Sequence, residues 1–183
     1  MRGLKIPIAL GVFVAVVLIG VAARSVYYKN QVLDPMTHQA SEISGVEGVR
    51  VSEAFDGRKD VYVQFGPKAP IEEAFPKVAG LARATFGASL GRVIPEDRRS
   101  TELEQVYHDI HFHVHEGIST GMFSQMASDV ARELADSGID RHRVFVGDHF
   151  VFVQLYDGEH YLFEVVPRSV DAAHAAQGGI ALW

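Results

Sequence analysis

The densest group of chemically active side chains is the segment 109–115, in which histidine alternates with apolar residues. Successive side chains of a β-strand point to opposite faces, so His111 and His113 would leave one face and converge on a zinc ion. Four further residues could supply a third ligand by type: Asp109, Glu116, His149 and His160. The plainer interpretation is a solvated row of histidines, and a third is a pH sensor, because imidazoles titrate near pH 6.5.

A second motif, Gly87-Ala-Ser89-Leu-Gly91, matches the G-x-S-x-G pattern of serine hydrolases. In those enzymes the serine follows a strand and precedes a helix. Here the flanking pattern predicts a helix before Ser89 and a loop after it, so we interpret the match as coincidence. The chain has no cysteine and no phosphate-binding glycine loop. The sequence therefore predicts no catalytic site.

Residues 6–23 form an apolar run without a single charge. As a helix this run would be about 27 Å long, close to the thickness of the hydrocarbon core of a bilayer. We expect a single transmembrane helix within an anchor of residues 1–29. The alternative is a cleaved signal peptide, with Arg2 and Lys5 before the run and a small-residue cleavage site at 21–23. Basic residues are balanced on both sides, and the signal-like arrangement favours a domain outside the cytoplasm.

Charge divides sharply along the chain. The first 29 residues hold four of the 17 basic residues and none of the 23 acidic ones, which leaves the remainder a net charge of −10 with histidine neutral. Such a domain is repelled by phosphate backbones and anionic headgroups, so we expect no nucleic-acid partner.

Hydrophobic periodicity predicts the order of elements after a stalk at 30–48. A hairpin is expected over 49–65, a helix from Pro70 to Phe86, a loop over 88–101 and a strand over 106–115. A second helix is expected from Ser119 or Thr120 to about Ser137. A meander of three strands follows at 144–146, 149–156 and 160–166. The expected fold is an α+β, two-layer sandwich over 49–168, with two helices on one face of a mostly antiparallel sheet.

The middle strand of that meander is apolar on both faces. The pattern indicates either a central strand, or a strand covered by a helix on one face and by a partner on the other. On the second interpretation Phe150, Phe152 and Val153 are candidate interface residues. The tail 169–183 ends in an apolar group that includes Trp183, a further candidate for docking.

These observations lead to a membrane-anchored, extracytoplasmic interaction domain as the first functional hypothesis. It would be a non-catalytic subunit of a homo-oligomer or of a larger membrane complex. The alternatives are a zinc-binding protein that uses His111 and His113, and a sensor of pH or of a small ligand.

Overall fold

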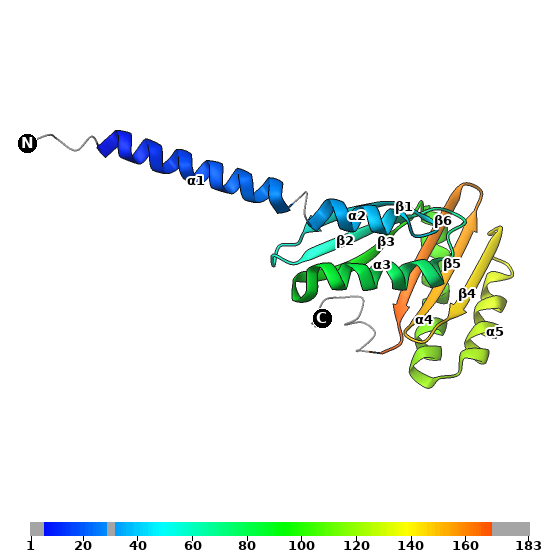
Figure 1. The fold of residues 1–183 in the computed structure, drawn as a ribbon. Coiled ribbons are helices and arrows are strands. Elements are labelled where there is room, and N and C mark those ends of the chain that lie inside the picture. Colours follow the sequence, from blue (N-terminus) through cyan, green and yellow to red (C-terminus); the bar gives the residue numbers. More distant parts are fainter. Residues whose placement is uncertain (1–5, 29–31, 170–183) are drawn as a thin grey trace, which may run out of the picture.

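The computed structural model describes residues 6–28 and 32–169. Within these residues the chain is an α+β protein with two three-stranded sheets and five α-helices (Figure 1). The predicted α+β class is confirmed. The expected single sheet with helices on one face is wrong, because the strands divide into sheet 1 (β1–β3) and sheet 2 (β4–β6) and sheet 2 is covered on both faces.

The first helix, α1 (Ile6–Tyr28), projects away from the rest of the molecule (Figure 1). Large apolar side chains on all sides of it are exposed, among them Leu10, Phe13, Val17 and Val21. Across the part of the chain that the structure describes, no helix reaches the length and hydropathy needed to cross a membrane.

Helix α2 (Asp34–Ser41) lies in the segment expected to be a stalk. Pro35 lies in its first turn, a position that suits proline because no N–H is needed there. Its Met36 and Ala40 are buried, and Met36 belongs to the first hydrophobic core. This helix therefore packs on the folded domain.

Sheet 1 begins with the predicted hairpin, which is confirmed. Strands β1 (Val46–Glu53) and β2 (Lys59–Phe65) pair antiparallel around a turn in which Gly57 has a φ of 82°. Helix α3 (Ile71–Phe86) follows close to its expected bounds and continues through Pro76.

Strand β3 (Leu90–Glu96) was expected to be a loop, and that prediction is wrong. It pairs parallel with β2 and contains Pro95. A proline is tolerated there because β3 is the last strand in the order β1-β2-β3 and has an unpaired edge within this sheet.

Sheet 2 is the predicted antiparallel meander of β4 (Arg141–Val146), β5 (Phe150–Asp157) and β6 (His160–Pro167). The central strand, β5, divides two cores. Phe150 and Phe152 contact Phe75 of α3 in the first core, and the centre of the Phe75 ring lies 5.5 Å from that of Phe150 and 6.3 Å from that of Phe152. Val151 and Val153 belong to the second core, formed with α4 and α5. Both faces of β5 are thus covered by this same chain.

Helix α4 (Thr101–Thr120) replaces the strand expected over 106–115, so that prediction is wrong. The alternating pattern concealed a helical stripe of apolar residues that face the second core: Leu103, Val106, Tyr107, Ile110, Val114 and Ile118. Phe112 lies outside this stripe and is 71% exposed. Ser100 caps the helix by accepting a hydrogen bond from the Leu103 amide at 3.3 Å.

Helix α5 (Phe123–Leu134) is shorter than the helix expected from Ser119 or Thr120 to Ser137, because α4 occupies its predicted start. The two helices approach closely at Gly117, where a Cβ would lie 2.6 Å from that of Met126. They form a hairpin that covers one face of sheet 2, while α3 lies on the other.

The segment 97–99 ties the two sheets together. The Asp97 side chain, 3% exposed, accepts hydrogen bonds from the Phe163 amide at 2.8 Å and from Arg99 at 2.9 Å. Arg99 also reaches Glu164 of β6 at 3.1 Å. Burial raises the pKa of the Glu164 carboxyl above its ordinary value, and Arg99 only partly opposes this shift.

Replacing Glu164 by glutamine should change how stability depends on pH. Because the pKa is raised in the folded state, the folded protein binds this proton more tightly than the unfolded chain does. The stabilisation that this proton gives the folded protein is complete below pH 4.5, the ordinary pKa of the carboxyl. It is lost as the pH rises through the raised pKa of the folded state. Urea titrations from about pH 4 to pH 8 should show the wild type losing stability relative to Glu164→Gln. Glu159→Gln, at an exposed carboxyl, is the control. A pH-independent difference for Glu164→Gln would contradict this account.

Candidate anion-binding pocket

The histidines of 109–115 do not converge as a strand would place them. Residues two apart on an α-helix point about 200° apart, so His111 and His113 leave different faces of α4. The His111 ring contacts the Phe112 ring at a tilt of 39°, with centroids 3.9 Å apart. His113 instead lines a hollow of about 280 Å³ that also borders Asp129 of α5.

The four further candidate ligands lie on three parts of the chain. On α4, Asp109 accepts a hydrogen bond from Gln105 at 2.9 Å and Glu116 borders the same hollow as His113. His149 lies in the turn between β4 and β5, and His160 begins β6. In the described residues no three side chains of histidine, cysteine, aspartate or glutamate lie close enough to hold a metal ion.

Ser89 of the G-x-S-x-G motif ends an exposed 3-10 turn, Gly87–Ser89, between α3 and β3. It follows a helix and precedes a strand, the reverse of the order that positions a nucleophile.

The candidate interface residues of β5 are buried inside the domain. Phe150 is in the first core with Phe152, and Val153 has no exposed surface in the second. The apolar character of both faces therefore has an explanation within this chain. Trp183 lies outside the described residues.

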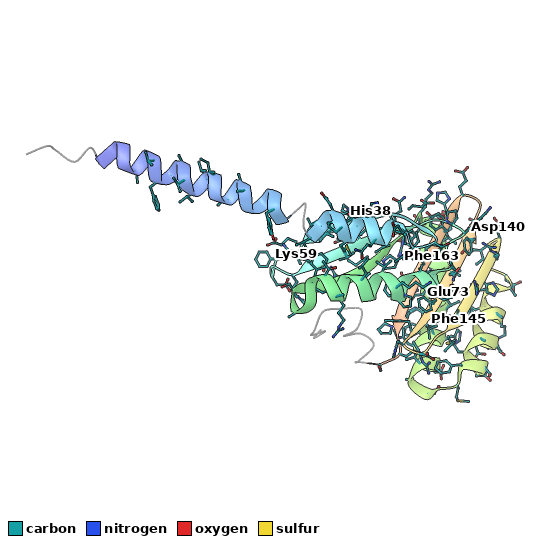
Figure 2. All side chains as sticks on the ribbon, viewed as in Figure 1. His38, Lys59, Glu73, Asp140, Phe145 and Phe163 are labelled. Carbon is teal, nitrogen blue, oxygen red and sulfur yellow. The ribbon has the colours of Figure 1, made fainter. Side chains whose placement is uncertain are left out.

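A different site lies where the two sheets meet. A pocket of about 330 Å³ opens between the β2–α3 loop, the beginning of β4 and the end of β5. Its polar lining residues are Lys68, Arg141, His142, Arg143, Gln154 and Tyr156. Figure 2 labels Asp140, which directly precedes β4, and Phe145 near the other end of the strand; the pocket borders the end next to Asp140.

A buried hydrogen-bond network forms the floor of the pocket. Gln154 is 2% exposed, and its amide nitrogen donates to Glu72 of α3 at 3.2 Å. The Tyr156 hydroxyl donates to the Gln154 amide oxygen at 2.9 Å. Glu72, with a side chain 9% exposed, also pairs with Arg143 at 2.6 Å. Each partner fixes the next, so the network holds Arg143 and Tyr156 in place.

The pocket carries more positive charge than its one carboxylate can balance. Glu72 pairs with Arg143, but among the described residues neither Lys68 nor Arg141 forms an ion pair. The Arg141 guanidinium lies 4.1 Å from the centre of the Tyr156 ring. A concentration of cations in a domain of net charge −10 is a local reversal of the overall field, and it attracts anions.

The donors of the pocket suit an oxyanion. Guanidinium groups match the geometry of carboxylates and phosphates, and an ammonium group adds a point charge. Burial raises the pKa of the Tyr156 phenol, against the opposing effect of Arg141 and Arg143. The phenol consequently keeps its proton at neutral pH, and it donates that proton to the Gln154 amide oxygen.

The pocket residues were missed from the sequence, although two signals pointed to them. Gln154 interrupts the apolar run of the central strand, where a polar residue needs a buried partner. Arg141 and Arg143 alternate at the start of β4 and thus share a face. What no local pattern indicates is that Glu72, 82 positions away, supplies that partner.

Gln154→Leu should destabilise the domain by about 1–3 kcal/mol, since Glu72 loses a donor and the Tyr156 hydroxyl loses its acceptor. Urea denaturation followed by circular dichroism measures this loss. The control is Gln125→Leu, which removes an exposed amide hydrogen-bonded to Asp129 on α5. Equal effects of the two substitutions would contradict a structural role for the buried network.

Comparisons with protein-family models, with curated proteins and with solved structures found no match. What the pocket binds must therefore follow from its own side chains. Their charge and donor geometry favour an anionic ligand.

Proposed function

We propose that this protein is a membrane-anchored, non-catalytic interaction domain that binds an oxyanion group of its partner in the cationic pocket. The proposal rests on three cations at one pocket. Lys68 and Arg141 form no ion pair with any described residue, and a buried network fixes the third cation, Arg143. The chemistry shared by the possible ligands is a carboxylate or phosphate group presented by another molecule.

The buried polar floor of the pocket favours a ligand-binding site over an ordinary patch of surface charge. Burying an amide and a carboxylate beside the first core is unfavourable unless their hydrogen bonds are made, and an apolar pair would fill the same space. Here Glu72 and Gln154 orient Arg143 and Tyr156 toward an open pocket of about 330 Å³. Fixed donors lose little freedom when a ligand binds.

The anchor in this proposal is the apolar run 6–23, with the domain outside the cytoplasm. Two observations support it. The run carries no charge, and its described large side chains are exposed to the surroundings of α1 instead of being packed on the domain. An extended apolar surface of this kind is unfavourable in water and favourable in lipid.

The anchor predicts that the full chain resists extraction from membranes at alkaline pH and floats with vesicles in a density gradient. Substituting Val14 and Leu18 by aspartate should release it, because charges at the centre of a membrane helix are strongly unfavourable. The matched control places aspartate at Thr37 and His38 of α2. Two results would contradict the anchor: release of the unaltered chain from the membrane, or continued membrane association of a chain that lacks its first 23 residues.

The pocket predicts binding of citrate, a tricarboxylate probe, by the full chain in detergent. Hydrogen bonds to charged groups contribute about 1.5–3 kcal/mol, so removing one cation should weaken binding roughly tenfold or more. Calorimetry would compare Arg141→Ala and Lys68→Ala with the control Lys77→Ala, which removes an exposed lysine of α3.

Citrate affinity equal in all three variants would contradict the pocket as the binding site. Inorganic phosphate, titrated in the same way, separates the two possible ligand groups. Tighter binding of phosphate than of citrate would assign the pocket to a phosphorylated partner.

A further inference from the structure

Strand β4 has an edge to which no other described strand is bonded. Among the described residues it pairs with β5 alone, as the first strand of sheet 2. Its first three residues, 141–143, are exposed, and Phe145 is 39% exposed. An unpaired edge presents free backbone N–H and C=O groups, which can accept another strand.

The hydrogen-bond pattern identifies the amides that face outward. The Gly147 amide donates to the Phe150 carbonyl at 2.9 Å, so this pair is a bonded pair of the β4–β5 ladder. Bonded and non-bonded pairs alternate in an antiparallel ladder. The amides of Phe145 and Arg143 therefore point toward β5, and those of His142, Val144 and Val146 point away from it.

The side chains along this edge have a defined order. Arg141, Arg143 and Phe145 share the face on which the pocket lies, because side chains alternate along a strand. An incoming strand would place its own side chains directly beside them. Acidic residues next to the two arginines and an apolar residue next to Phe145 would complement this face.

A second copy of the chain fits this edge poorly. Antiparallel pairing of two β4 strands would bring arginines of both copies onto one small face, and like charges on neighbouring strands are destabilising. Positive charge on an edge also discourages non-specific strand addition. The same charge selects an acidic strand, since specificity comes from rejecting wrong partners as well as from attracting the right one.

We infer that the partner presents an extended acidic segment that adds to β4 as a fourth, antiparallel strand of sheet 2, with its carboxylates beside the pocket. This inference rests on the proposed function and names its ligand as a protein segment. The segment has an apolar residue followed, two and four positions later, by acidic residues. Backbone hydrogen bonds give the affinity, and alternate side chains give the specificity.

The test is amide hydrogen exchange of the full chain in detergent, with and without the capped peptide Val-Thr-Glu-Thr-Glu. The outward amides of His142, Val144 and Val146 should exchange more slowly when the peptide is bound. A peptide with lysine in place of glutamate should give no such protection.

The matched variants are Val144→Pro and Val144→Thr. Proline removes one outward N–H but leaves the bonds to β5, so the domain should fold while peptide affinity falls. Threonine keeps that N–H and should keep the affinity. No slowing of exchange along β4, or equal affinity of both variants, would overturn the added strand.

A parallel measurement of citrate binding shows whether the added strand alone is wrong or whether the anion-binding pocket is wrong as well. Citrate binding with no protection of β4 would leave the pocket as an anion site and overturn the strand. Loss of both would overturn the proposed function as well.

Discussion

The burial of β5 on both faces is the constraint on which the rest of the structure depends. Val151, Val153 and Leu155 enter the core formed with α4 and α5, whereas Phe150 and Phe152 enter the core formed with α3. A strand in this position exposes neither face to water, and in this structure the helices that cover both faces come from the chain itself. The meander, the helical hairpin and α3 are consequently parts of one packing arrangement, with β5 between its two cores.

The same constraint produces the pocket. Along the α3 side of β5 the residues run from Phe150 and Phe152 to Gln154 and Tyr156, from an apolar core to a polar rim. A buried amide at position 154 requires partners, and Glu72 at the start of α3 provides one. The second oxygen of Glu72 then pairs with Arg143. The need to satisfy the buried Gln154 amide therefore also fixes the orientation of the Arg143 guanidinium at the surface.

Local sequence patterns predicted the elements that depend mainly on residues close to them in the chain. The β1–β2 hairpin, α3 and the meander were found because turns and periodicity are short-range signals. The prediction failed at 106–115, where alternating histidines imitate a strand while Ile110 and Val114 keep helical spacing. It failed at β3 because Pro95 is tolerated on an edge, and edge positions depend on strand order. The pocket was missed because its lining comes from three separate parts of the chain.

The histidines illustrate how a candidate site depends on the element that carries it. On a strand His111 and His113 would share a face, and on α4 they do not. The zinc site stays a prediction without geometric support, whereas the cationic pocket rests on contacts between residues distant in sequence.

Anomalous diffraction from crystals of the protein soaked in selenate would test the central claim most directly, because the ion mimics the oxyanion group and reports its own position. The account predicts a selenium peak in the pocket, within hydrogen-bonding distance of the Arg141 guanidinium and the Lys68 ammonium group. A pocket without a peak, in crystals whose other surface sites are occupied, would contradict it.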